Sequence, residues 1–288
     1  GDVHDLRRLG AICSALSHAC AAKPELRNAV RSMNRTESRL RIIGVDVATQ
    51  PKSVGLAHCA YRDSRLQVET ILVEPTWEAI DARIGSWLRA PASGVPTLLA
   101  LDAPLGWPST LSEALQSHRA GESLPPGANE LFRRRTDDAV AAALGKRPLD
   151  VGADRIARTA HAALRLLARL RRTHELEIPL AWDPGPPSTT SAIEVYPAGT
   201  LVSRSLPSSG YKGPAPKAAA ARDRIIDGLT TELAFSSESA SLMQSSDHLL
   251  DAVLCCVAAH DFANGRVIEP DIPDLARQEG WIWVAPRS

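Results

Sequence analysis

Two stretches of the sequence decide the fold: Arg41–Val47, RIIGVDV, and Thr97–Leu101, TLLAL. The first is an apolar run rich in β-branched residues, which is typical of a strand. The second is wholly apolar, as expected of a strand buried on both faces. An aspartate lies at the end of each run: Asp46 is the penultimate residue of the first, and Asp102 directly follows the second. We therefore predict two core strands with a carboxylate at the carboxyl end of each.

The segments around these two runs predict the remaining elements of the sheet domain. Strands joined by short connections are expected to form an antiparallel meander, and apolar residues spaced 3 and 4 apart predict an amphipathic helix. The expected elements are, in order, strands at Val54–Tyr61 and Leu66–Val73, a helix at Thr76–Leu88, a strand at Ser191–Tyr196, helices at Lys217–Leu233 and Ser246–Ala263, and a closing strand at 280–284.

This order of elements predicts an α/β protein with a ribonuclease H-like, mixed five-stranded sheet flanked by helices. The turn after Asp46 lacks G-x-G-x-x-G, so a dinucleotide-binding fold is disfavoured. Segment 104–190 has frequent Pro and Gly at its margins and a helical, basic centre, so we expect it to be an insertion. Residues 39–288 are expected to form a single domain, and residues 1–38 an N-terminal extension outside it.

The composition excludes several classes of protein. Lys and Arg together number 33, as do Asp and Glu, so the net charge of +0 excludes a binder that relies on overall positive charge. The five cysteines form no C-x-x-C pair, which argues against a disulfide framework or a zinc site. No long apolar window predicts a membrane span. We expect a cytoplasmic protein without a membrane partner.

Acidic residues fall at positions where the predicted elements would bring them together. Asp46 and Asp102 end strands that are neighbours in a ribonuclease H-like sheet, and Glu194 lies within the next strand. Asp247 and Asp251 are spaced i, i+4 on the last long helix and share one of its faces. Clustered carboxylates repel one another unless a cation lies between them, and hard oxygen ligands suit Mg²⁺ or Mn²⁺. We predict these five as metal ligands.

Each of these carboxylates also has a structural explanation. An aspartate at the end of a strand commonly caps the following turn. Asp247 would serve equally well as the N-cap of its helix. Joint placement on the right elements favours a functional group.

A basic region occupies the centre of the predicted insertion. Between residues 133 and 172 there are eleven Lys and Arg against four Asp. A helix over Asp154–Thr173 would place a stripe of arginines on one side, and such a stripe can follow a phosphate backbone. A solvated polar face is the commoner fate of such a run. The residues predicted to bind substrate phosphate are Arg135, Arg155, Arg158, Arg165, Arg169 and Lys212. The histidines, including His248, are expected to be structural or surface residues.

Six pieces of the chain, in this order, resemble a known family. They are IIGVDVA (42–48), LLALDAPLGWP (98–108), IEVYPAGT (193–200), the Tyr211-Lys212 pair, SDHLLDAVLCCVAAH (246–260) and EGWIWVAP (279–286). The chain resembles the domain-of-unknown-function 429 family, predicted nucleases of the ribonuclease H fold whose activity is itself inferred from the fold. The resemblance implies Asp46, Asp102, Glu194 and Asp251 as the catalytic acidic centre, with Asp247 as a possible further member.

Three hypotheses for the function follow. The first is a metal-dependent nuclease that hydrolyses DNA or RNA by a two-metal-ion mechanism. The second is an actin-like or sugar-kinase-type nucleotide-binding enzyme, which stabilisation by nucleotide would favour, although Thr49-Gln50-Pro51 is a poor phosphate cradle. The third is a non-catalytic ribonuclease H-like binding scaffold, which an incomplete acidic cluster would favour.

Overall fold

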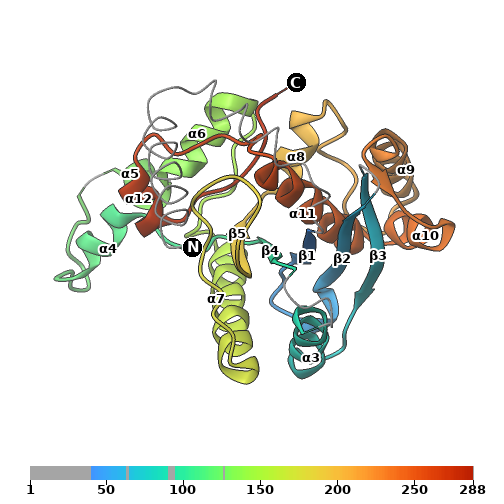
Figure 1. Ribbon diagram of the computed structural model, residues 1–288. Coiled ribbons are helices and arrows are strands. Elements are labelled where there is room, and N and C mark those ends of the chain that lie inside the picture. The colour runs from blue at the N-terminus through green and yellow to red at the C-terminus, as the bar shows by residue number, and fades with distance from the viewer. Residues whose placement is uncertain (1–39, 63–64, 90–94, 126, 288) are drawn as a thin grey trace, which may run out of the picture. The chain divides into compact units, whose positions relative to one another are not determined.

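A mixed β-sheet with the strand order β5-β4-β1-β2-β3-β6 forms the centre of the protein (Figure 1). The computed structural model describes residues 40–62, 65–89, 95–125 and 127–287. The strands β1 and β3 are both antiparallel to β2, whereas β4 and β5 run parallel to β1 and β6 runs parallel to β3. The strands are β1 (Arg41–Asp46), β2 (Gly55–Arg62), β3 (Arg65–Val73), β4 (Thr97–Asp102), β5 (Ser191–Glu194) and β6 (Leu233–Ala234).

The observed sheet has six strands, one more than the five predicted, because the short strand β6 is added at its edge. The helix expected to extend to Leu233 ends at Leu229 instead. Leu233 is buried and pairs with Leu66 in β3, so burial in the sheet core takes precedence over continuing the helical pattern. The closing strand expected at 280–284 is reduced to one bridge between Ile282 and Glu194, beside the end of β5.

Helices cover both faces of the sheet and bury its two apolar surfaces. On one face lie α3 (Trp77–Leu88) and α7 (Asp154–His174), which contact each other and share a core with Val45 and Leu101. On the other face α11 (Asp247–Ala263) lies across β1, β2 and β4. The remaining helices of this second layer are α8 (Pro197–Ser203), α9 (Pro216–Leu229) and α10 (Ser237–Ser245).

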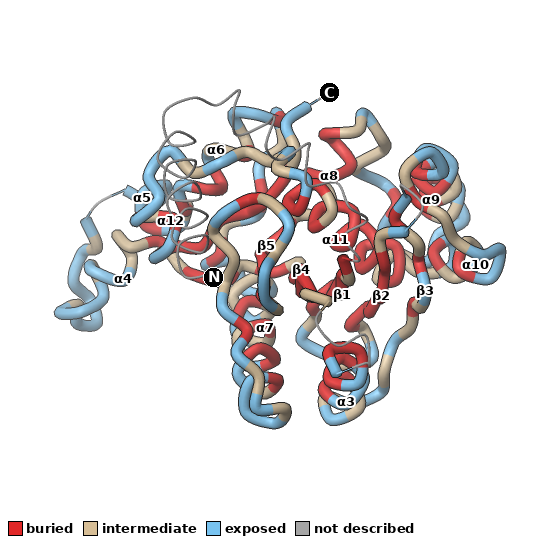
Figure 2. Tube along the Cα trace, viewed as in Figure 1, coloured by how far each residue is buried: buried red, intermediate tan, exposed pale blue. Residues whose placement is uncertain are grey.

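The backbone of the helix α11 packs directly against the sheet because two glycines remove side chains from the contact. A Cβ atom at Gly44 would lie 2.0 Å from the carbonyl oxygen of Ala252, and one at Gly55 would lie 2.0 Å from that of His248. The helix is apolar nearly all round, as expected of a helix enclosed by other elements. Figure 2 shows it buried along most of its length. This close approach brings the first turns of α11 to the ends of β1 and β4.

The segment predicted as an insertion divides into two parts. Its first helices, α4 (Ser109–Leu115), α5 (Ala128–Phe132) and α6 (Arg135–Leu144), gather with α12 (Pro273–Glu279) to one side of the sheet (Figure 1). The predicted basic helix is present as α7, but it is one of the covering layers of the sheet, because Ala163, Leu167 and Leu170 fill the core beneath it.

The predicted extension at residues 1–38 lies outside the described residues. Within the part of the chain that the structure describes, no helix combines the length and the apolar character needed to cross a bilayer.

Candidate metal centre

Asp46 and Asp102 are aligned at the ends of two neighbouring parallel strands. Each is the last residue of its strand, and their Cα atoms are partners in the β1–β4 register. Side chains alternate along a strand, so both lie on the same face as Gly44, where α11 packs. Asp46 is buried with 6% of its surface exposed, whereas Asp102 is partly exposed. The prediction that these two aspartates meet at one edge of the sheet is confirmed.

The helix α11 adds a third carboxylate to this pair. Asp251 lies in the second turn of the helix, and only 1% of its surface is exposed. One carboxylate oxygen from each of Asp46, Asp102 and Asp251 lies within 4.8 Å of the others. Three hard oxygen donors at this spacing suit a divalent cation that prefers oxygen ligands. The group, which we call the aspartate triad, can therefore hold a metal ion.

Burial and mutual repulsion dominate the electrostatics of the triad. Burial is the main cause that raises the pKa of all three groups. Mutual repulsion adds to it, since Asp46 raises the pKa of both Asp102 and Asp251. The pKa of Asp251 rises to about 6. A bound cation would relieve both the burial cost and the repulsion.

Lys212 contacts the triad, which agrees with its predicted position near the metal. Its Nζ lies 2.8 Å from Oδ2 of Asp251, and the hydroxyl of Tyr211 donates a hydrogen bond of 2.9 Å to Oδ1 of the same residue. Burial opposes the charge of Lys212, but Asp251 and Asp102 outweigh it and raise the pKa of the ammonium group. Tyr211 was not singled out as a site residue from the sequence.

His248 is partly exposed, as expected of a surface residue, and it also contacts the triad, a contact that was not predicted from the sequence. Its Nδ1 lies 2.6 Å from Oδ2 of Asp46, and this hydrogen bond is the main cause that raises the pKa of the imidazole. The sequence held a signal for this placement, because His248 precedes Asp251 by three residues and so shares its helix face. The side chain is 42% exposed, so the imidazole lies between the triad and solvent.

Asp247, predicted as a further ligand, is not part of the triad. Its Oδ2 accepts a hydrogen bond of 3.3 Å from the backbone N–H of Gly213. The N-cap of α11 is Ser246, whose hydroxyl accepts from the N–H of Leu249, so Asp247 is not the cap either. Asp247 nevertheless raises the pKa of Asp46, which shows that its charge acts on the group.

The structure does not bring Glu194 to the triad either. Glu194 is the register partner of Leu101, whose side chain packs in the core beneath α3 and α7, so Glu194 points to the face opposite Asp102. There Arg134, buried with 1% exposed, donates to both carboxylate oxygens at 2.8 and 3.0 Å. Burial raises the pKa of Glu194, and Arg134 opposes this shift. Strand alternation together with the β4–β5 register separates Glu194 from the other acids.

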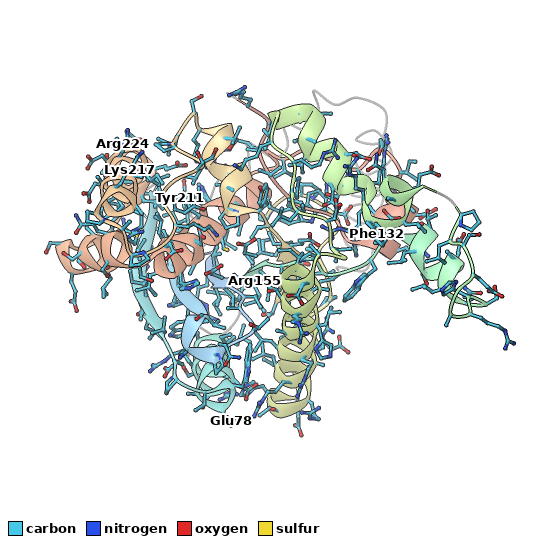
Figure 3. The ribbon with its side chains drawn as sticks, turned by 180° about the vertical axis from the view of Figure 1, so that it is seen from behind. Glu78, Phe132, Arg155, Tyr211, Lys217 and Arg224 are labelled. Carbon is cyan, nitrogen blue, oxygen red and sulfur yellow. The ribbon has the colours of Figure 1, made fainter. Side chains whose placement is uncertain are left out.

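The predicted arginines lie on the surface, and several have carboxylate partners there. Arg135 pairs with Asp271, while on α7 Arg158 pairs with Asp154 and Arg169 pairs with Glu78 of α3. Arg155 and Arg165 are exposed. Figure 3 shows Arg155 at the end of α7 that lies away from Glu78. Of the predicted phosphate-binding residues, Lys212 is the one that the described structure places on the triad.

The comparison with known proteins supports the family resemblance predicted from the sequence. No curated protein matches the chain. A family model described as "Protein of unknown function (DUF429)" matches residues 11–274, which is most of the chain. The match includes all three aspartates, Lys212 and His248. The chain therefore belongs to the DUF429 family of proteins of unknown function.

Proposed function

We propose that this protein is a divalent-metal-dependent phosphodiesterase that hydrolyses nucleic acid, with Mg²⁺ or Mn²⁺ held by the aspartate triad. The observation that carries the proposal is the meeting of Asp46, Asp102 and Asp251 within 4.8 Å, from three different elements. Crowding three carboxylates together, two of them buried, costs stability unless a cation neutralises them. A site of this cost is better explained by a cation than by a role in folding.

The arrangement of the sheet supports a ribonuclease H-like interpretation of the fold. The strands β1, β2 and β3 form an antiparallel meander, and β4 and β5 extend it in parallel on the other side of β1. A ribonuclease H-like sheet has its first and fourth strands side by side, and Asp46 and Asp102 end these two strands, β1 and β4. The short β6 at the far edge adds to this pattern and lies away from the triad.

A bound divalent ion would polarise a phosphoryl oxygen and lower the pKa of a coordinated water. The chain itself supplies the ligands, a positively charged Lys212 and the partly exposed imidazole of His248 at the rim. In the hydrolysis, a water molecule would lose a proton as its oxygen bonds to phosphorus, the ester P–O bond would break, and the leaving oxygen would take up a proton. The exposed arginines of α7 would attract the phosphate backbone of a nucleic acid.

The donor set favours one tightly held ion over the two expected from the sequence. A second ion would need a further carboxylate, and Glu194 is held by Arg134 on the opposite face. We therefore propose a single high-affinity site at the aspartate triad. Titration with Mn²⁺ tests this directly through the number of ions bound per chain.

The test of the reaction is cleavage of labelled single-stranded, duplex, hybrid and branched nucleic acids in the presence of Mn²⁺. Asp46→Asn, Asp102→Asn and Asp251→Asn should each reduce the rate at least about 100-fold, equivalent to about 2.7 kcal/mol. Asp154→Asn, which removes an exposed carboxylate on α7, is the matched control and should retain the rate. Full activity in the triad variants would refute the proposal.

The two other hypotheses predict different results. A nucleotide-binding enzyme would gain thermal stability from ATP without cleaving nucleic acid. A binding scaffold would bind nucleic acid with equal affinity with and without Mn²⁺.

A further inference from the structure

The backbone of the loop Tyr211–Gly213 is held by hydrogen bonds from a buried arginine. Arg222 of α9 has 2% of its surface exposed and donates to the carbonyl oxygens of Tyr211, Gly213 and Gln244 at 2.6, 3.0 and 2.5 Å. Burying a guanidinium group is costly, and here backbone carbonyls satisfy it. The contacts hold the backbone on both sides of Lys212.

Two further contacts join the same loop to α11. The N–H of Gly213 donates to Asp247, and the hydroxyl of Tyr211 donates to Asp251. Figure 3 shows Tyr211 beside the part of α9 that carries Lys217. Lys212 therefore extends from a loop whose backbone is held by α9 and α11. The position of this loop brings the ammonium group of Lys212 to the triad.

The contact between Lys212 and Asp251 joins an exposed, charged side chain to a buried carboxylate. The Lys212 side chain is 58% exposed, whereas that of Asp251 is 1% exposed. An exposed lysine loses side-chain entropy when it is held in one position, so the strong field of the triad must hold it there. Its ammonium group contacts Oδ2 of Asp251, while Tyr211 occupies Oδ1.

A metal ion and this ammonium group would compete for the same oxygen. Two positive centres at one carboxylate oxygen repel each other strongly at such short distance. Asp46 and Asp102 retain oxygens for the metal, but Asp251 becomes a full ligand only when Lys212 withdraws. The withdrawn ammonium group would remain beside the metal on a fixed loop, within reach of an anionic substrate.

We propose that Lys212 is a resident counter-ion of the aspartate triad, which a divalent cation must displace from Asp251 and which then binds the substrate phosphate. This inference rests on the proposed metal-dependent function and adds a regulatory feature to the same site. Lys212 lowers the affinity for the metal in the absence of substrate. Phosphate that engages Lys212 removes this competitor, so metal and substrate are bound with positive coupling.

Removing the charge of Lys212 should therefore strengthen metal binding. The experiment is calorimetric titration of the full chain with Mn²⁺ alone, at neutral pH and low ionic strength. Lys212→Met should bind Mn²⁺ at least about tenfold more tightly than the wild type, because one unit of opposing charge is removed from the triad. Lys212→Arg keeps the charge and should stay near the wild-type affinity. Lys217→Met removes an exposed lysine from α9 and is the matched control.

A double variant separates direct competition from a general effect of surface charge. If Lys212 acts through Asp251, then Lys212→Met should change Mn²⁺ affinity much less in an Asp251→Asn background. Circular dichroism of each variant verifies that the fold is retained. Since Lys212 is exposed, its substitution leaves the core intact.

The outcomes distinguish failure of the counter-ion inference from failure of the proposed metal-dependent function. Equal or weaker Mn²⁺ binding by Lys212→Met overturns the counter-ion inference and leaves the metal centre standing. The same gain in Lys217→Met as in Lys212→Met also overturns it, since the effect would then be one of net charge. Absence of Mn²⁺ binding in the wild type and all variants overturns the proposed function, and the inference with it.

Discussion

Asp46 and Asp102 are register partners across the parallel β1–β4 pair, and the carboxylate of Asp46 raises the pKa of Asp102. The strand register determines that they meet, and burial determines that their repulsion is strong. With Asp251 from α11 they form a concentrated negative site, which Lys212, His248 and the hydroxyl of Tyr211 contact. Several measurable consequences follow from this arrangement.

The metal-free protein should lose stability as the pH rises through the titration of Asp251. Burial raises the pKa of this group from 3.8 to about 6, so the folded state retains a proton that the unfolded state has lost. Between about pH 4 and pH 6 its contribution falls by on the order of 2–3 kcal/mol. Urea denaturation in the presence of EDTA at a series of pH values measures this slope. Asp251→Asn should flatten it, and an unchanged slope in that variant would refute the assignment.

Mn²⁺ should reverse this pH dependence. Protons and metal compete for the same carboxylates, so the stabilisation by a fixed concentration of Mn²⁺ should grow as the pH rises through about 6, where Asp251 loses its proton. Thermal unfolding at several pH values, with and without the metal, measures the difference. Stabilisation that is independent of pH would indicate binding elsewhere.

Arg134 and Glu194 should prove to be a structural pair without a role in metal binding. Removing one partner leaves a buried charge, so Arg134→Met should cost about 3–5 kcal/mol of unfolding free energy. The neighbouring Arg135 makes an exposed ion pair with Asp271, and Arg135→Met should cost less than about 1 kcal/mol. Urea denaturation compares the two adjacent arginines.

The Glu194→Gln variant distinguishes a structural role for this carboxylate, as the partner of Arg134, from the role of metal ligand predicted from the sequence. It should lower stability and leave the Mn²⁺ affinity unchanged, because Glu194 lies on the face opposite the triad. A loss of Mn²⁺ affinity of more than about tenfold, equivalent to about 1.4 kcal/mol, would restore Glu194 as a ligand.

The glycine at position 44 should be required for the site as well as for packing. A Cβ there would lie 2.0 Å from the Ala252 carbonyl oxygen, so Gly44→Ala should push α11 away from β1. We expect a loss of about 1–3 kcal/mol in stability together with weaker Mn²⁺ binding. Gly127→Ala, where the nearest atom lies 3.8 Å away, is the control and should change neither property. Normal Mn²⁺ affinity in a folded Gly44→Ala protein would contradict the account.

The exposed arginines of α7 should contribute to nucleic-acid binding through charge alone. Arg155→Gln combined with Arg165→Gln should weaken binding of all sequences similarly and reduce the slope of log affinity against log salt by about 1–2. The control pair is Lys217→Gln with Arg224→Gln, two exposed cations of α9 labelled in Figure 3. Equal effects of the two double variants would remove the special role of α7.

Much of the fold and the centre of the site could be predicted from local sequence patterns. Strand ends identified Asp46 and Asp102, and helical spacing placed Asp251 on the right face. The alternation of β5 puts Glu194 on the side of the sheet opposite Ile193 and Val195, but the core layer that those two residues join depends on the pairing of β5 with β4. Glu194 was therefore predicted beside the other acids, whereas the structure places it on the opposite face with Arg134.

Other features depend on residues far apart in the chain. Arg134 meets Glu194 across 60 positions, and Arg222 is satisfied by carbonyl groups that any residue type would provide. The two-residue β6 follows from the burial of Leu233 against β3, which no local pattern displays. The partner of His248 was missed because Asp46 lies 202 residues away.

Calorimetric titration of the full chain and of its Asp102→Asn variant with Mn²⁺ tests the central claim most directly. Asp102 is the partly exposed member of the triad, so its replacement should disturb folding least. The account predicts that the wild type binds one tightly held ion per chain and that the variant loses this binding. Equal binding by both proteins, or no binding by the wild type, would contradict it.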